Sequence, residues 1–253
     1  MTIPESPIIQ IERRKAIAFI ISALLLALAI GGGLIKVGAG FASRTNNGIV
    51  VTGSARTDAV ADNAVWTLSV SLSRPKVADA VAKVGNDVEA VTKYLADGGI
   101  PAEALTFGPV STYAQEEYIN GNSTGRILNY RASRDITVRT NDVQLVSKLS
   151  QGIGTILQSG VSVNNYGPQY YISTLAELRP KLLEEAMKDA NLRAISITKA
   201  VGSKVGAVTG VKAGLFQVTT PDSIATSDGG AYDTTTIKKT VTTTVSVTFT
   251  VKK

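Results

Sequence analysis

The chain has 253 residues, a formal net charge of +6, and neither cysteine nor histidine. Without cysteine there is no disulfide, thiolate metal site or cysteine nucleophile, and without histidine there is no histidine-based catalytic triad. The basic residues form no long run, so we expect no nucleic-acid partner.

Residues 16–35 form the one long uncharged apolar run in the sequence. A helix rises about 1.5 Å per residue, so this run spans roughly 30 Å, the thickness of a bilayer core. We predict a transmembrane helix over residues 16–36, preceded by a cytoplasmic N-terminus over residues 1–15. Cations at positions 13–15 precede the run, and the positive-inside rule then favours export of everything that follows it.

The alternative to this anchor is a cleavable signal peptide with its cleavage site within Gly38–Ala42. We favour the anchor, because the apolar region of a signal peptide is normally only about 7–15 residues long. Ala23, Ala27 and Gly31 would share one face of the membrane helix and allow a second helix to approach closely. The simpler explanation for these three is that small residues are common in membrane helices.

Residues 37–48 are small and polar, and we interpret them as a linker to an exported domain over residues 49–253. A first strand is predicted for residues 48–57. Apolar side chains alternate with Thr and Ser over residues 62–73, which predicts a second strand with one buried face.

A helix is predicted next, from Pro75 to about residue 96, because valines and other apolar residues recur there with helical spacing. The pair Gly98-Gly99 ends it. Residues 105–118 and 126–140 predict a long hairpin, joined by a polar connection rich in Asn and Gly.

A second amphipathic helix is predicted for residues 142–158, with Asp142 near its N-terminal cap. Residues 161–173 predict a strand. A third helix is predicted to start near Thr174 or Pro180 and to end near Val201, and Thr174 with Glu177 matches a capping box.

The last part of the chain is predicted to be strand, loop and strand, over residues 205–218, 219–236 and 237–251. The final strand alternates most regularly, with Val or Phe on one face and Thr or Ser on the other. The whole exported part therefore predicts an α+β fold of long antiparallel strands with amphipathic covering helices.

Five segments carry motifs whose order and spacing are informative together, although none is specific alone. They are Val51–Ala55 (VTGSA), Ala61–Trp66 (ADNAVW), Leu178–Ala194, Gly202–Val218 and Ile237–Val241 (IKKTV). They resemble the SIMPL-domain family of exported bacterial proteins, which includes the periplasmic immunogenic proteins. The resemblance extends over about residues 49–252, with one departure in the spacing of the Ala and Arg residues in the third helix.

The resemblance implies an α+β fold, export into the bacterial cell envelope, and assembly into large homo-oligomeric rings or shells. Some members of the family are linked to stress tolerance. The family has no agreed enzymatic activity and no accepted catalytic residues, so we expect no catalytic residue, no cofactor and no metal site in this chain.

The chemistry-bearing patterns in the chain have simple structural explanations. The pairs Glu116-Glu117 and Glu184-Glu185 do not predict a glycosidase, because adjacent side chains on a strand or helix diverge and cannot face each other across a cleft. The glycines at 152, 154 and 160 do not form a phosphate loop, because they lie late in a predicted helix and no Lys-Ser/Thr pair follows.

Six tyrosines lie in two predicted β segments rich in Asn and Gly, where they would make adaptable contacts with a sugar or another subunit. Ordinary cross-strand aromatic pairs explain them equally well. The six are Tyr113, Tyr118, Tyr130, Tyr166, Tyr170 and Tyr171.

We therefore predict a non-enzymatic exported protein that is anchored in a bacterial cell membrane and assembles with itself, its main domain periplasmic or extracellular. The expected physical basis of assembly is pairing through long strands, above all residues 237–251, if they form an exposed sheet edge. The alternative is a cell-envelope module that binds polysaccharide or peptide through the tyrosines. A hydrolase that uses carboxylates is the weakest hypothesis.

Overall fold

The computed structural model describes residues 26–30, 48–223 and 227–253. Residues 26–30 are helical, but the remainder of the predicted anchor, with Ala23 and Gly31, lies outside the described residues. Within the described part of the chain, no helix is both long enough and apolar enough to cross a membrane.

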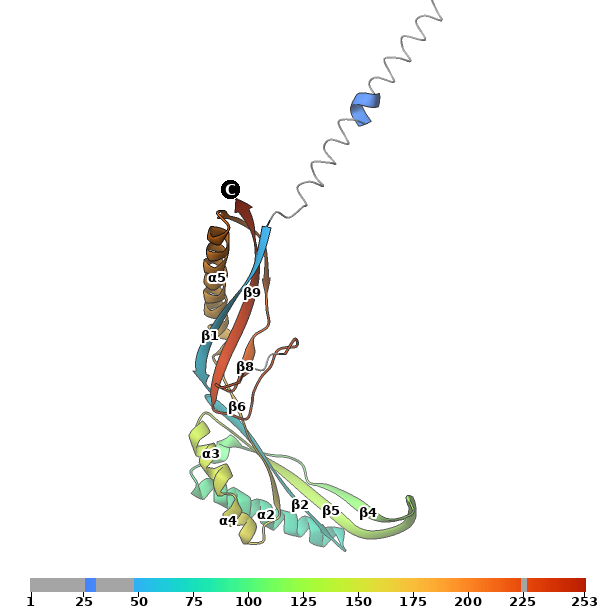
Figure 1. Ribbon diagram of the computed structural model, residues 1–253. Helices are drawn as coiled ribbons and strands as arrows, with labels where there is room; N and C mark the ends of the chain where they lie inside the picture. The colour runs from blue at the N-terminus through green and yellow to red at the C-terminus, as the bar shows by residue number, and fades with distance from the viewer. Residues whose placement is uncertain (1–25, 31–47, 224–226) are drawn as a thin grey trace, which may run out of the picture.

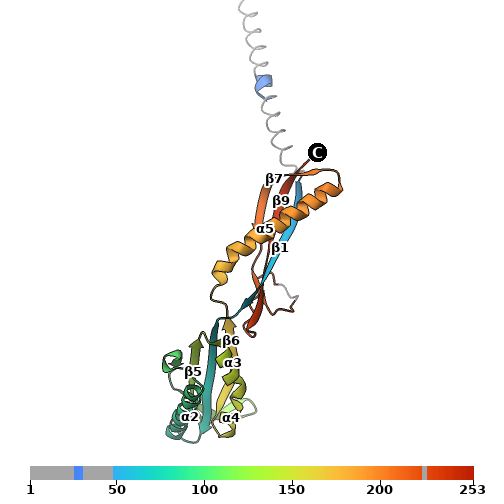
Figure 2. The same cartoon turned by 90° about the vertical axis from the view of Figure 1, so that its left-hand side faces the viewer.

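The domain is elongated and consists of two lobes, each with its own antiparallel sheet and its own hydrophobic core (Figures 1 and 2). The inserted lobe comprises residues 63–171. The terminal lobe comprises residues 48–60 and 175–252, so its sheet joins the first and last strands of the domain. The α+β class predicted from the sequence is confirmed.

The terminal lobe is a four-stranded sheet with one long helix across one face (Figure 2). The register between its first and last strands runs without a break from Gly48 opposite Thr250 to Val60 opposite Lys238. Its elements are β1 (Gly48–Val60), α5 (Leu175–Ala200), β7 (Lys204–Ala213), β8 (Gln217–Thr219) and β9 (Lys238–Lys252).

The position of β9 corrects one prediction. The sequence pointed to this strand as an exposed edge, but β9 lies between β1 and β7, and β8 also pairs with it. Its predicted apolar face is buried, as at Val245 and Val247, while Thr244 on the other face is exposed. The outer strands of this sheet are β1 and β7.

The inserted lobe is a five-stranded sheet in the order β3-β5-β2-β6. β3 and β4 both pair with β5, β3 with residues 136–138 and β4 with residues 122–133. Trp66 and Leu68 of β2 lie fully buried at its centre, beneath the helices. Its elements are β2 (Asn63–Arg74), α2 (Val77–Asp97), η1 (Ala102–Ala104), β3 (Leu105–Phe107), β4 (Ser111–Ile119), β5 (Asn122–Thr140), α3 (Val143–Gly152), α4 (Gly154–Gln158) and β6 (Val163–Tyr171).

Most helix boundaries follow from local signals. α2 ends at the predicted glycine pair, where Gly99 adopts a φ of 98°. Asp142 caps α3, because its Oδ1 accepts a hydrogen bond from the Leu145 N–H at 2.9 Å. The helix predicted over residues 142–158 is instead two helices that meet at Ile153.

The start of α5 differs from the predicted capping box. The helix begins after Thr174, but the Thr174 side chain makes no capping hydrogen bond. Its main-chain carbonyl accepts from the Glu177 N–H at 3.0 Å instead. Pro180 is the sixth residue of the helix, so α5 lacks the hydrogen bond that an N–H at this position would donate.

Candidate functional site

In the terminal lobe, α5 lies directly on the backbone of β1. A Cβ atom at Gly53 would lie 2.1 Å from the Ala186 carbonyl oxygen and 2.4 Å from the Ala190 nitrogen. Ala186, Ala190 and Ala194 are fully buried along this side of the helix. The small residues therefore allow a helix and a strand to touch through their main chains, which larger side chains would prevent.

Hydrogen bonds from an ion pair within α5 join the helix to the outer strand β1. The Ser54 N–H donates to Asp189 Oδ2 at 2.8 Å, and Arg193 Nη2 lies 2.9 Å from the same oxygen. The hydrogen bond from Ser54, supported by Arg193, lowers the pKa of Asp189 below its usual value. An N–H of a strand with a partner on only one side is thereby satisfied.

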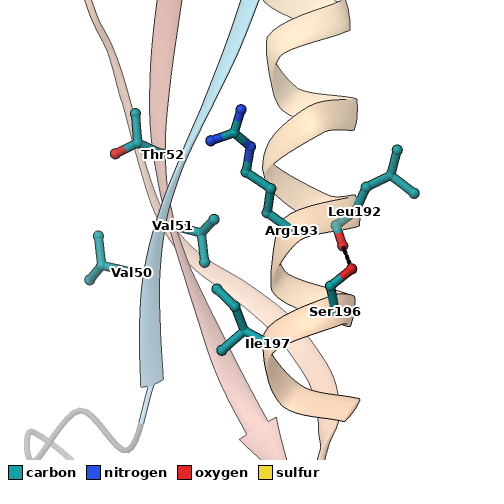
Figure 3. Close-up of a pocket in the computed structure, with 7 residues that line it drawn as sticks. All are labelled: Val50, Val51, Thr52, Leu192, Arg193, Ser196 and Ile197. Carbon is teal, nitrogen blue, oxygen red and sulfur yellow. Dashed lines mark hydrogen bonds between the residues drawn. The ribbon is translucent and has the colours of Figure 1, made fainter. Parts of the chain in front are cut away.

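A hollow of about 500 Å³ lies beside this ion pair, between β1 and α5 (Figure 3). Val51 points toward the helix and Ile197, whereas Val50 and Thr52 point away from it. The one charged residue lining the hollow is Arg193, which already binds Asp189. This arrangement offers apolar contact but no free acid, base or nucleophile.

Hydrogen bonds also join the two lobes where the chain passes between them. The Asp62 carboxylate accepts from the Ser173 N–H at 2.8 Å and from Ser173 Oγ at 2.6 Å. These bonds lower the pKa of Asp62. The Tyr170 N–H donates to the Thr234 carbonyl at 2.7 Å, so the last strand of the inserted lobe is tied to the loop before β9.

Beneath this junction lies a buried ion pair. Lys239 is fully buried, and its Nζ lies 3.1 Å from Asp233 Oδ2 and 5.9 Å from the centre of the Tyr232 ring. Burial alone would raise the pKa of Asp233, but hydrogen bonds from Thr236, Thr235 and Lys239 outweigh it and hold the pKa well below its usual value. The carboxylate and the ammonium group therefore neutralise each other. We interpret this buried ion pair as a structural feature rather than a reactive one.

Comparison with known families gives a match to the SIMPL family, described as a protein of unknown function (DUF541), over residues 49–251. The chain belongs to the SIMPL family. A comparison with curated proteins gives no significant match.

The motif residues of the SIMPL domain have identifiable structural tasks. Gly53 permits the close approach of α5, Asp62 binds Ser173 at the junction, and Lys239 forms the buried ion pair. These residues belong to the sequence motifs of the family, but sequence patterns alone assign them no role. A signal was present for Lys239, because it lies in phase with the buried face of β9, two residues before Val241.

The most exposed part of the SIMPL domain is the end of the β4–β5 hairpin, which projects from the inserted lobe (Figure 1). β2 pairs with β5 only from Tyr130 onward, so residues 122–129 pair with β4 alone. We call residues 114–129 the arm. Its exposed apolar residues are Tyr118, Ile119, Ile127 and Leu128.

The six tyrosines do not form one cluster. Tyr113 and Tyr118 lie exposed on β4, and Tyr130 is half-buried on β5. The other three belong to β6, at the opposite edge of the sheet from β4. There Tyr166 is exposed, Tyr170 is part of the core, and Tyr171 lies 6.0 Å from the ring of Tyr232 at the junction.

Three of the four carboxylates in the two Glu-Glu pairs bind local partners. Glu116 accepts a hydrogen bond from Ser123, and Glu117 pairs with Thr124 and Arg126 across the arm. Glu184 pairs with Lys188 on the surface of α5. Among the described residues, no group of three or more Asp, Glu, His or Cys side chains is placed to hold a metal ion.

Proposed function

We propose that this SIMPL protein is a membrane-anchored, exported, non-enzymatic protein that assembles into a homo-oligomeric ring or shell and serves a structural or stress-related role in the cell envelope. The apolar run at residues 16–35 and the cations before it support the anchor and its orientation. The observation that carries the assembly is the arm.

The arm is a two-stranded ribbon without a core of its own. An isolated two-stranded ribbon is marginally stable in water, because it cannot bury an apolar face. Tyr118 and Ile119 are 66% and 57% exposed, and Ile127 and Leu128 are 46% and 44% exposed. Docking onto a neighbouring copy would bury these side chains, and the outer strands β1 and β7 offer further edges for pairing.

Such a contact joins different surfaces of the two copies, since the arm of one molecule would meet the body of the next. Contacts of this kind produce closed rings when the rotation between neighbours closes on itself. Reciprocal docking of two arms would instead give a two-fold dimer, and the resemblance to the SIMPL family is the reason for proposing a ring or shell.

The test is the mass of the detergent-solubilised full chain by light scattering, for the wild type and for an Ile119→Ser/Leu128→Ser variant. We expect a large species for the wild type and a marked fall in mass for the variant. A Leu157→Ser variant is the matched control, because Leu157 is an exposed apolar residue of α4, away from the arm. A monomeric wild type at micromolar concentration would contradict the assembly.

That monomeric outcome would favour the second candidate, a cell-envelope module that binds polysaccharide or peptide. The observation in its favour is that Tyr113 and Tyr118 are 55% and 66% exposed on the same strand. Aromatic side chains presented in this way suit contact with sugar rings. Loss of binding in a Tyr113→Ser/Tyr118→Ser variant would identify this function.

A further inference from the structure

The end of the terminal lobe farthest from the inserted lobe brings several chain segments together (Figures 1 and 2). β1 begins there with Gly48 opposite Thr250, and β7 begins there with Lys204 opposite Lys252. The C-terminal end of α5 lies beside them, because residues 199 and 204 line one hollow. We call this surface the terminal cap.

The terminal cap carries a cluster of lysines and no Asp or Glu side chain. Lys199, Lys204, Lys252 and Lys253 are all exposed there, and none belongs to an ion pair within the described residues. The sequence contains no Asp or Glu over residues 13–57, 190–221 or 234–253, which include every strand and helix end at the cap. The acidic residues of the domain lie elsewhere, so the charge is segregated.

The terminal cap is also apolar at its tip. Val201 is 72% exposed at the turn that ends α5, where Gly202 has a φ of 70°, and it lies between Lys199 and Lys204 in the sequence. Val50 and Ile197 are 68% and 48% exposed nearby. A hollow of about 720 Å³ between α5 and β7 is lined by both lysines and by Ile195 and Val205. Exposed apolar side chains next to several lysines are typical of surfaces that meet lipid headgroups.

The chain outside the structure indicates what meets this surface. Residues 37–47 connect the apolar run to Gly48, and eleven residues span at most about 40 Å even when fully extended. The tether therefore attaches to the domain at the terminal cap, which brings this end of the domain nearest to the bilayer that contains the anchor. This step rests on the proposed anchoring.

We propose that the terminal cap docks on the surface of a membrane that contains anionic lipids. The lysines bind lipid phosphates, and Val201 enters the headgroup region between them. The long axis of the domain then points away from the membrane surface. The arms of neighbouring copies then lie at the same distance from that surface.

The absence of cysteine allows a direct test on the full chain. A Val201→Cys variant carries an environment-sensitive fluorophore and is reconstituted in phosphatidylcholine vesicles with or without phosphatidylglycerol. Lipids with a quencher in the headgroup region should quench the label several-fold more with phosphatidylglycerol, and high salt should remove the difference. A label at Gln158→Cys, in the inserted lobe, should show no such dependence.

A charge variant supplies the second measurement. Lys199→Gln/Lys204→Gln should lose most of the phosphatidylglycerol-dependent quenching, whereas Lys76→Gln/Lys148→Gln should keep it, because those exposed lysines lie in the inserted lobe. Equal quenching in both vesicle types would overturn the docking. So would a Val201 label that is shielded from both lipid-borne and water-soluble quenchers, which would place a protein partner on the terminal cap.

Vesicle flotation after alkaline extraction separates this proposal from the anchor. If the chain resists extraction but the label at position 201 is not quenched, the anchor is right and the docking is wrong. If alkaline extraction removes the chain, yet it binds phosphatidylglycerol vesicles through Lys199 and Lys204, the docking is right and the anchor is wrong. A chain that binds neither vesicle type contradicts both.

Discussion

At the scale of single residues, the buried pair of Lys239 and Asp233 is the feature with the largest energetic consequence. Lys239 is fully buried, and the side chain of Asp233 is 14% exposed. A buried charge that loses its partner costs far more than an exposed one, because water cannot replace the missing interaction. The pair of Asp189 and Arg193, which is exposed on α5, gives the natural comparison.

We expect Asp233→Asn to lower the free energy of unfolding by about 3–5 kcal/mol, because it leaves the Lys239 ammonium buried without an anion. Asp189→Asn should cost much less than Asp233→Asn, since ion pairs in contact with water contribute little. Urea unfolding measures both. A Lys239→Met/Asp233→Asn double variant should recover part of the loss. If Asp233→Asn and Asp189→Asn lowered the free energy of unfolding equally, burial of the Lys239–Asp233 pair would not contribute to stability.

Acid should weaken the junction. The pKa values of Asp62 and Asp233 lie below their unfolded values, so the two carboxylates stabilise the folded state above the unfolded pKa of about 4. That stabilisation is lost as the pH falls through their folded pKa values. We expect the free energy of unfolding to decrease as the pH is lowered from about 4. The decrease in the free energy of unfolding should be smaller in the Asp233→Asn variant than in the wild type. An equal decrease in both would mean that other groups cause it.

At the scale of elements, the contact between β1 and α5 decides how the terminal lobe is built. The strand and the helix touch at Gly53, where the main chain of the helix at Ala186 and Ala190 lies against the strand. The contact leaves no room for a side chain, so the requirement for glycine here is steric.

Gly53→Ala should destabilise the domain by at least about 1–3 kcal/mol, because the new Cβ meets backbone atoms that cannot move independently. Gly85→Ala is the matched control: Gly85 lies in α2, and no atom lies within 4 Å of the position of its Cβ. That change should stabilise the helix by up to about 1 kcal/mol. Thermal unfolding compares the two, and a harmless Gly53→Ala would show that α5 can shift.

At the scale of the whole molecule, the two lobes place different surfaces at opposite ends. The terminal cap lies beside the start of β1, and the arm projects from the inserted lobe (Figure 1). If assembly depends on the domain, it does not require the membrane helix. Small-residue contacts between membrane helices are weak, whereas interfaces between domains commonly bury more than about 1,000 Å².

We therefore expect a truncated chain that starts at Asn47 to remain a large species in light scattering. The Ile119→Ser/Leu128→Ser change in this truncated chain should reduce the mass, as in the full chain. If the truncated chain is folded and monomeric at micromolar concentration, assembly through the domain is contradicted, and any assembly of the full chain would depend on the membrane helix.

Local patterns in the sequence were enough to predict most elements, because alternation and helical spacing depend on near neighbours. The strand at 237–251, the end of α2 at Gly98-Gly99 and the cap at Asp142 were all predicted in this way. The motifs also identified the family. Each of these features is encoded within a few residues of where it occurs.

Only the tertiary structure could decide which strands are neighbours. β9 lies inside the sheet because β1, some 200 residues earlier, pairs with it from Gly48 to Val60, and no local pattern encodes that distant partner. The same pairing divides the chain into two lobes and buries Lys239 beside Asp233. The long arm and the terminal cap are likewise properties of which segments meet. Sequence periodicity therefore determined the elements, and long-range strand pairing decided the surfaces on which function depends.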